Sequence, residues 1–197
     1  MPPPHRTSTT TTAPPGANSR PDPSLLAGRR VVFTANTAWY LHNHHRTVLK
    51  AFLDAGARVH VLVPEGPRCE ELAEEGCRVV ALPLRPSSHN PLREARAFAS
   101  ILAAYRSIRP HAAFHYTIKC NIYGGAAARV LGIPYVNNVP GLGSAFRSGG
   151  FTRFVAREAL RVTQRGAARV FLQNPEDAAY MREQGLVTEA QAVLVPG

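Results

Sequence analysis

The 197-residue sequence has no apolar run of the roughly 18 residues that a membrane-spanning helix requires, which argues against an ordinary transmembrane protein. Its first residues, MPPPHRTSTTTTAPPG, contain no apolar core, so we do not expect a secretory signal peptide. Cysteine is scarce as well. Cys69, Cys77 and Cys120 are odd in number and lack CxxC spacing, so we expect ordinary thiols in a reducing cytosol rather than a disulfide framework.

Acidic residues are few, and lysine is almost absent. The chain carries 13 Asp and Glu against 23 Lys and Arg, a net charge of +10, and all but Lys50 and Lys119 of these cations are arginines. Arginine with abundant alanine reflects a GC-rich genome, so part of this charge is compositional. A basic surface can serve nucleic acid, an anionic membrane or a phosphorylated substrate. The sequence has no helix-turn-helix, zinc-finger or aromatic-basic pattern, so we expect no nucleic-acid partner.

The hydropathy pattern divides the chain into a tail and one domain. Residues 1–27 are rich in Pro and Thr and are predicted to be disordered, because they cannot bury enough apolar surface. Residues 28–197 alternate short β-branched runs with helical periods. This alternation predicts the α/β class, with a doubly wound, Rossmann-like parallel sheet. The predicted strands are 29–35, 57–64, 77–84, 109–117, 133–139, 168–174 and a last one from 191, and the predicted helices are 46–56, 67–76, 91–109, 121–132, 149–167 and 175–185.

The loops after the strands are where such a sheet binds ligands. The first, NTAWYLHNHHR, has no GxGxxG, which argues against dinucleotide binding there. His44 and His45 beside a helix start could hold an anionic or hydroxylated ligand, or form a surface cluster without one. No carboxylate or cysteine accompanies them, so we predict no metal site.

The loop HYTIKCNIYGG carries the most chemistry. Lys119 can offset phosphate charge, and Asn121 can hydrogen-bond sugar hydroxyls both as donor and as acceptor. His115 at the strand end could act near a reacting hydroxyl, or be a core histidine satisfied by its surroundings. Gly124 and Gly125 are interpreted as allowing close helix packing rather than catalysis.

Two further features are ambiguous. Gly141 and Gly143 in NNVPGLGSAF place a turn beside the predicted site, or simply form a tight loop with positive φ. Arginines also recur every four residues from 153 to 169, opposite several apolar residues, so Arg153, Arg157 and Arg161 could bind anionic lipid headgroups or form an ordinary solvated face.

Five segments follow one another in a familiar order and spacing: HNPLREARAF, HYTIKCNIYG, NNVPGLGSAF, FLQNPEDAAYM and LVPG. In these segments residues 30–197 resemble family 4 glycosyltransferases, most narrowly the bacterial subgroup that extends lipid-linked oligosaccharides, capsule and O-antigen. The chain departs from the family pattern at Cys120, where the family has Pro, and at Pro140, where it has Thr. An aromatic residue usually stands where His45 precedes Arg46. The change to Pro140 removes a hydroxyl from the expected acceptor contacts.

The resemblance implies a GT-B architecture, in which two Rossmann-like halves enclose the active site. The N-terminal half is then expected to bind the acceptor and the other half the nucleotide sugar, with retention and without metal or cofactor. Residues 28–197 would be the first half, with the donor-binding domain absent. Under this resemblance His115 is the catalytic candidate. The substrate-binding candidates are Asn43 and Arg46 at the start of the first helix, Lys119 and Asn121 in the cleft, and Gly141 and Gly143 shaping it.

The predicted function is acceptor binding in the transfer of a hexosyl or N-acetylhexosaminyl group to a polyprenyl-diphosphate-linked or polysaccharide acceptor. The chain would work in cell-envelope polysaccharide biosynthesis, in the cytoplasm or peripherally on the inner membrane face, and would be inactive alone. The alternatives are a non-catalytic anchoring subunit that recruits a donor-binding partner chain, and a truncated gene product. The sugar, acceptor and linkage cannot be read from this sequence, because donor choice resides mostly in the other half.

Overall fold

The computed structural model describes residues 24–85, 90–142 and 151–195, the last range without the side chains of residues 151–153. Within them, seven strands form one parallel sheet in the order β3-β2-β1-β4-β5-β6-β7. The strands are β1 (Arg30–Thr34), β2 (Arg58–Val63), β3 (Arg78–Ala81), β4 (Ala112–Tyr116), β5 (Tyr135–Val139), β6 (Arg169–Leu172) and β7 (Ala192–Leu194). The helices are α1 (Ala38–Asp54), α2 (Cys69–Glu74), α3 (Pro91–Ile108), α4 (Ile118–Val130), α6 (Phe151–Arg165) and α7 (Pro175–Glu183). The predicted α/β class and Rossmann-like sheet are confirmed.

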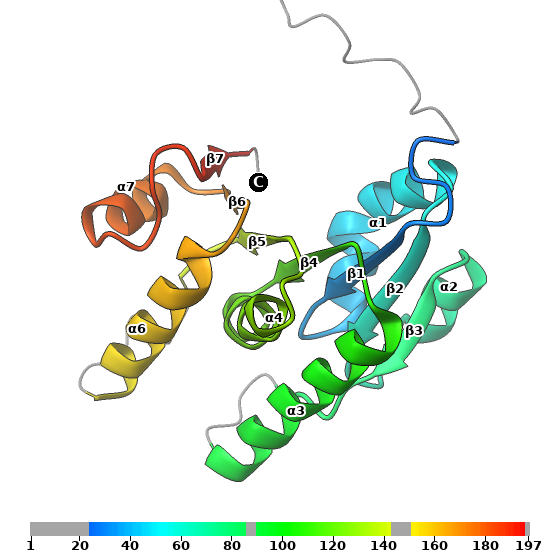
Figure 1. Ribbon diagram of the computed structural model, residues 1–197, viewed down its shortest axis with the longest axis horizontal. Coiled ribbons are helices and arrows are strands. Elements are labelled where there is room, and N and C mark those ends of the chain that lie inside the picture. Colours follow the sequence, from blue (N-terminus) through cyan, green and yellow to red (C-terminus); the bar gives the residue numbers. More distant parts are fainter. Residues whose placement is uncertain (1–23, 86–89, 143–150, 196–197) are drawn as a thin grey trace, which may run out of the picture.

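Helices cover both faces of the sheet. In Figure 1, α1 and α2 lie on one side of the central strands, and α3, α4 and α6 lie on the other. The central strands β1 and β2 are almost continuously buried, as expected when both faces of a parallel strand are covered. The chain leaves β1 toward β2 and β3, then returns to place β4 on the other side of β1. This reversal makes the carboxyl ends of β1 and β4 the topological switch point, where doubly wound sheets bind ligands.

Local sequence explains where the helices begin. The Asn90 side chain accepts hydrogen bonds from two amides of the first turn of α3, and Asn174 does the same for α7. Each asparagine is followed by a proline, whose fixed φ suits the first helical position. Thr37 caps α1 by accepting from the Tyr40 amide at 3.1 Å.

The start of the first helix differs from the prediction. Because Thr37 caps a helix that begins at Ala38, the predicted loop 36–45 is mostly helix. The prediction that Asn43 and Arg46 stand at a helix start is therefore wrong, since both lie well inside α1.

The predicted tail also ends earlier than expected. Residues 24–28 form a turn, and the Leu26 amide donates to the Ala55 carbonyl at 2.9 Å, while the Leu26 side chain packs against the core under α1. The rest of the predicted tail, residues 1–23, lies outside the described residues.

The three cysteines are free thiols, with Cys77 and Cys120 buried and Cys69 half-buried, as the spacing predicts. None of the helices within the described ranges combines the length and apolar character needed to cross a membrane.

Candidate functional site

The junction between β4 and α4 holds the most strained residue of the region. Thr117 has φ 74° and ψ 154°, and its side chain makes no capping hydrogen bond to the helix that follows. This backbone region is essentially restricted to glycine and costs a threonine on the order of 1–3 kcal/mol. Such residues persist only where the surrounding structure holds them in place, and they are concentrated at functional sites. Thr117 lies at the carboxyl end of β4, beside the switch point.

Three buried oxygen atoms of residues near this edge of the sheet lack hydrogen-bond partners. Asn121 Nδ2 donates to the Asn138 carbonyl at 3.0 Å, which joins α4 to the end of β5. However, Asn121 Oδ1, Asn138 Oδ1 and Thr117 Oγ1 form no hydrogen bond with nitrogen or oxygen in the described part of the chain. The Thr117 hydroxyl lies beside the buried Cys120 thiol, which is only a weak partner. A buried acceptor without a partner costs about 1–3 kcal/mol, so these atoms, here named the oxygen set, are suited to accept hydrogen bonds from ligand hydroxyls.

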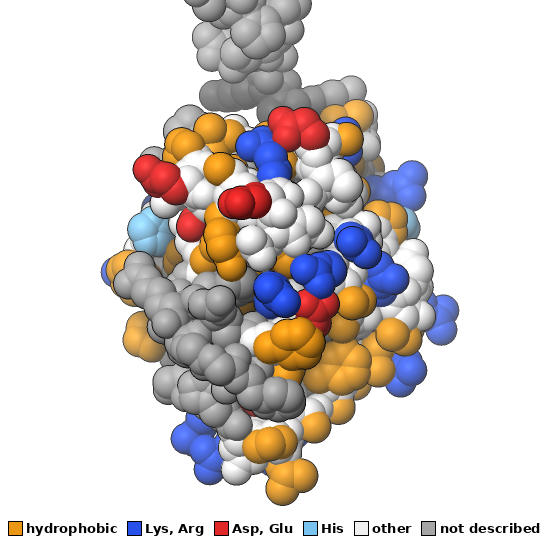
Figure 2. All heavy atoms as spheres, turned by 90° about the vertical axis from the view of Figure 1, so that its left-hand side faces the viewer, with side chains coloured by type: hydrophobic (Ala, Val, Ile, Leu, Met, Phe, Trp, Pro, Cys, Tyr) orange, Lys and Arg blue, Asp and Glu red, His pale blue; other side chains and the backbone are white. Residues whose placement is uncertain are grey.

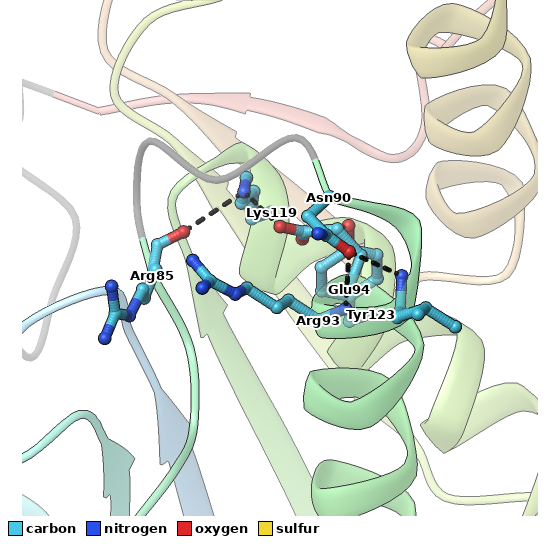
Figure 3. A network of polar contacts seen from close by, with 7 residues as sticks. Arg85, Asn90, Arg93, Glu94, Lys119 and Tyr123 are labelled. Atoms are coloured by element: carbon cyan, nitrogen blue, oxygen red, sulfur yellow. Dashed lines mark hydrogen bonds and ion pairs between the residues drawn. The ribbon is translucent and has the colours of Figure 1, made fainter.

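Lys119 belongs to a network that joins three segments (Figure 3). Its Nζ donates to Glu94 Oε1 at 2.9 Å and to the Arg85 carbonyl at 3.1 Å, while the Tyr123 hydroxyl donates to Glu94 Oε2 at 2.6 Å. The Lys119 and Glu94 side chains are only about one-fifth exposed. Burial and the Glu94 carboxylate raise the pKa of Tyr123, which keeps its proton for that bond. Lys119 therefore already forms an ion pair with Glu94, in addition to any contact that it would make with a phosphate.

His115 is fully buried within a chain of hydrogen bonds. Its Nδ1 lies 2.7 Å from Asn137 Oδ1, and its Nε2 lies 2.9 Å from the Tyr105 hydroxyl. Asn137 Nδ2 donates to Gln164 Oε1, so Asn137 Oδ1 accepts from His115 Nδ1–H. His115 Nε2 then accepts from Tyr105, whose oxygen accepts from the Thr34 hydroxyl at 3.1 Å.

Burial keeps His115 neutral. Burial lowers its pKa to about 4, although the bond to Asn137 acts in the opposite direction. The geometry is that of the core-histidine alternative, because both ring nitrogens of His115 already bond to other side chains and neither is left for a substrate.

The glycines of α4 are packing residues, as interpreted from the sequence. A Cβ atom on Gly124 would collide with the imidazole of His115, and one on Gly125 would lie 3.0 Å from Thr163 Cβ on α6. Gly124 therefore allows α4 to pass directly over the His115 ring.

The loop after β5 is fixed to α7. The Leu142 amide donates to Asp177 Oδ2 at 3.2 Å, and a Cβ on Gly141 would lie in ordinary contact with that oxygen at 3.7 Å. Gly141 does not have the positive φ that a tight glycine loop would need. Gly143 lies outside the described residues.

The first-helix candidates lie apart from the oxygen set. Arg46 Nε lies 2.7 Å from Glu75 Oε1, at the end of α2, and His42 Nε2 lies 3.6 Å from the same oxygen. The exposed Asn43 contacts the ring of His42 at 3.2 Å. The contacts of Arg46 and His42 join α1 to the end of α2, and that of Asn43 stays within α1, so the structure does not bring Asn43 and Arg46 together with Lys119 and Asn121.

The two adjacent histidines of α1 differ in environment. His44 is exposed, and its ring contacts those of Trp39 and Tyr40 at centroid distances of 5.5 Å and 5.2 Å. His45 is buried against the ring of Tyr116 at 4.2 Å, and burial, followed by the nearby His44, lowers its pKa to about 4. They do not form one surface cluster.

The arginine pattern of α6 differs from a simple basic face. Arg157 and Arg161 both pair with Glu158, and Arg161 also donates to the Gln184 carbonyl at 3.2 Å. Arg169 lies on β6 rather than on the helix, and the Arg153 side chain lies outside the described residues. The residues predicted to lie opposite the arginines include three that the structure exposes: Phe154, Val155 and Val162. Figure 2 shows hydrophobic side chains beside Lys and Arg side chains on the face that carries α6 and α7.

The sequence interpretation missed Thr117, Asn138 and Glu94. A lone hydroxyl residue between a strand and a helix, and two asparagines inside an otherwise apolar strand, were available as signals for the first two. Glu94 had no signal, because it meets Lys119 only through tertiary packing. In the part of the chain that the structure describes, no three histidine, cysteine or acidic side chains come close enough to hold a metal ion.

Comparison with known proteins gives a family and a fold. Residues 42–197 match the family model described as a glycosyl transferase 4-like domain. A curated relative from Campylobacter jejuni, N,N'-diacetylbacillosaminyl-diphospho-undecaprenol alpha-1,3-N-acetylgalactosaminyltransferase, is 25% identical over 162 residues, covering 80% of this chain and 43% of the relative. The chain thus spans less than half the length of that relative.

Solved structures agree on the architecture. Sucrose-phosphate synthase from Thermosynechococcus elongatus superimposes with a TM-score of 0.61 at 12% identity, over 85% of this chain and 48% of that one. MurG of Acinetobacter baumannii gives a TM-score of 0.56 at 18% identity, over 86% and 45%. At these identities the likeness shows the fold alone, which is the Rossmann-like fold of GT-B proteins.

Proposed function

Since this chain belongs to the glycosyl transferase 4-like family, we propose that residues 28–197 bind the acceptor in a glycosyl transfer from a nucleotide sugar. The acceptor is a polyprenyl-diphosphate-linked sugar or a polysaccharide. The name of the Campylobacter jejuni relative, which describes transfer of N-acetylgalactosamine to a diphospho-undecaprenol-linked sugar, supports this acceptor class. The single observation that carries the proposal is the oxygen set, which places unpartnered acceptors beside the switch point.

The proposed role of these residues is to hold and orient the acceptor. Sugar hydroxyls donate to Asn121 Oδ1 and Asn138 Oδ1, and the Thr117 hydroxyl can either donate or accept. Lys119 lies in the same first turn of α4 and approaches an acceptor diphosphate, with Glu94 holding its position. Correct placement of the attacking hydroxyl is itself a large part of such catalysis, because it removes the entropy cost of bringing two substrates together. Residues 1–197 alone are expected to transfer no sugar, since the nucleotide sugar binds elsewhere.

Calorimetric titration of the full 197-residue chain tests the proposal. Farnesyl-diphosphate-linked N-acetylglucosamine should bind, and UDP-N-acetylglucosamine should not. Asn138→Ala should weaken binding about 3- to 10-fold, the equivalent of one hydrogen bond. Lys119→Gln should weaken it too, while Lys50→Gln is the matched control, because Lys50 is an exposed residue of α1 paired with Asp54.

Three results would overturn the proposal or part of it. Binding of the nucleotide sugar without binding of the prenyl compound would reverse the assignment of this domain. Equal affinity in Asn138→Ala and the parent chain would remove the oxygen set from the site. Sugar transfer by the purified chain alone would contradict the expected inactivity.

A membrane location on the inner face of the cell membrane is part of the proposal. Phe154, Val155 and Val162 are each about half exposed on α6, the helix that also carries Arg157 and Arg161. An exposed apolar patch flanked by arginines suits the boundary of an anionic bilayer, where the apolar side chains enter the acyl region and the cations meet headgroups.

Vesicle co-sedimentation tests the location. The chain should sediment with phosphatidylglycerol vesicles more than with phosphatidylcholine vesicles, and Phe154→Ser with Val155→Ser should abolish the difference. Leu92→Ser is the control, because Leu92 is 82% exposed on α3, a different helix. Unchanged sedimentation of the double variant would rule out α6 as the membrane surface.

A further inference from the structure

A hollow lies at the carboxyl edge of the sheet, at the ends of β2 and β3. It has a volume of about 790 Å³ and is bordered by Val63, Ala81 and the segment 65–71. This volume lies within the range usual for small-molecule sites. The strand order places β1 between β2 and β4, so at about 4.8 Å per strand the hollow lies roughly 14 Å from the oxygen set along the same edge.

Most of the charged side chains around this hollow are acidic, although the chain as a whole is basic. Glu65, Glu70 and Glu71 line it with Arg68 as the one cation, although the whole chain has a net charge of +10. Arg68 is already bonded to Glu71 at 3.0 Å, while Glu65 and Glu70 form no ion pair within the described ranges. A phosphate or another anion would be repelled by this lining, whereas neutral hydroxyl groups would find two carboxylates that accept hydrogen bonds.

The lining of the hollow also contains Trp39, the single tryptophan of the protein. Trp39 is the second residue of α1 and remains 49% exposed, with its ring in edge contact with His44 at 5.5 Å. Tryptophan is usually well buried, and a half-exposed indole beside a hollow offers a rigid, flat apolar surface. A pyranose ring has a matching pair of surfaces, with C–H groups on one face and hydroxyls around its edge.

We propose that this hollow, which Trp39 and the carboxylates of Glu65 and Glu70 line, binds a neutral sugar unit of the acceptor glycan, distant from the unit held by the oxygen set. The C–H face of the sugar packs on the indole, and its hydroxyls donate to the two carboxylates. The inference rests on the proposed acceptor-binding function and extends it, because a glycan of several units can occupy both places on one edge of the sheet. For a polysaccharide acceptor, the hollow then selects by a sugar unit that lies away from the growing end.

Fluorescence of Trp39 tests this directly, because no other tryptophan contributes. Methyl glycosides of N-acetylglucosamine and N-acetylgalactosamine are titrated into the full chain, with inorganic phosphate as a separate titrant. At least one glycoside should give a saturable change in emission and protect Trp39 from acrylamide quenching, while phosphate should give neither. Glu65→Gln with Glu70→Gln should weaken glycoside binding at least about tenfold, because both charge-assisted hydrogen bonds become weaker bonds to neutral amides.

Glu74→Gln is the matched control, because Glu74 is an exposed glutamate of α2 that does not border the hollow. Absence of any saturable change, or equal affinity in the double variant and the parent chain, would overturn the inference. Binding of farnesyl-diphosphate-linked N-acetylglucosamine in the same preparation separates the two failures. If that compound binds and the glycosides leave Trp39 unchanged, only this second sugar site is wrong. If the glycosides bind and the prenyl compound does not, the acceptor proposal fails and the hollow stands as a sugar site.

Discussion

Two neighbouring asparagines on β5 differ in how completely their side chains are hydrogen-bonded. Asn137 has both side-chain atoms bonded, one to His115 and the other to Gln164, inside a polar chain that begins at Thr34. One residue later, Asn138 Oδ1 has no hydrogen-bond partner in the described structure, and Asn121 Oδ1 on α4 also lacks one. Residue type is identical, so only the completeness of the hydrogen bonding separates a structural polar group from one suited to a ligand.

Replacing His115 should cause the largest loss of stability, because it interrupts the side-chain hydrogen-bond chain that begins at Thr34. In His115→Leu the Tyr105 hydroxyl loses an acceptor and Asn137 Oδ1 loses a donor. At about 1–3 kcal/mol for each buried group left unpaired, unfolding free energy should fall by about 2–6 kcal/mol. Urea unfolding measures this, and His44→Ala, at an exposed position of α1, should change stability by less than about 0.5 kcal/mol.

His115→Leu also tests whether the hydrogen-bond chain from Thr34 to Gln164 takes part in acceptor binding. At a temperature where it remains folded, acceptor binding should equal that of the parent chain, because both ring nitrogens of His115 bond to other side chains and not to a ligand. A binding defect in folded His115→Leu would mean that this hydrogen-bond chain also contributes to ligand binding.

The pH dependence of stability gives the next largest effect. His115 has a pKa of about 4 when folded, against 6.5 ordinarily, so the unfolded chain binds its proton first. Stability from this group is therefore complete above pH 6.5, is lost as pH falls from 6.5 toward 4, and changes no further below 4. The loss amounts to about 3 kcal/mol. Urea unfolding across this range should show a smaller slope in His115→Leu, with the remainder due in part to His45, whose pKa is lowered in the same direction. Equal slopes in the two proteins would show that His115 is not buried in its neutral form.

A smaller change tests why glycine stands over the His115 ring. Gly124→Ala places a methyl group against the imidazole, so we expect a loss of about 1–3 kcal/mol from overpacking, measured by thermal or urea unfolding. Gly66→Ala is the control, because a Cβ there meets nothing within 4 Å and its φ is not positive, so it should be neutral or slightly stabilising. If both alanine variants behaved alike, close packing of α4 on His115 would not be the reason for this glycine.

The sequence predicted the order of strands and helices because each carries a local signal. Valine-rich runs such as 58–63 mark strands covered on both faces, and Asn-Pro pairs mark the starts of α3 and α7. The first helix was placed eight residues too late, at 46 rather than Ala38, because the aromatic and histidine residues before Arg46 obscured a helical period that the Thr37 cap begins.

The candidate site was predicted only in outline. Lys119 and Asn121 lie at the edge that the sheet rule indicates, but their partners Glu94 and Asn138 come from α3 and β5. Pairings between distant segments leave no local pattern, and burial cannot be read from one residue. His115 shows this, since a histidine at a strand end fits catalysis and a satisfied core position equally well until Tyr105 and Asn137 are seen around it.

Thr117→Gly gives the smallest and most discriminating effect, because stability and binding should move in opposite directions. Glycine accepts φ 74° and ψ 154° without strain, so relief of that strain, partly offset by the greater freedom of glycine in the unfolded chain, should raise stability by about 1 kcal/mol. The variant also removes one oxygen of the set, so the affinity for farnesyl-diphosphate-linked N-acetylglucosamine should fall about 3- to 10-fold. Urea unfolding and calorimetry on the same preparation measure both. A residue kept only for folding would not be improved by its removal, so a gain in stability with a loss of binding identifies Thr117 as held in strain for the ligand. A loss of stability without a change in affinity would instead place Thr117 with Asn137, among the groups that the fold needs for itself.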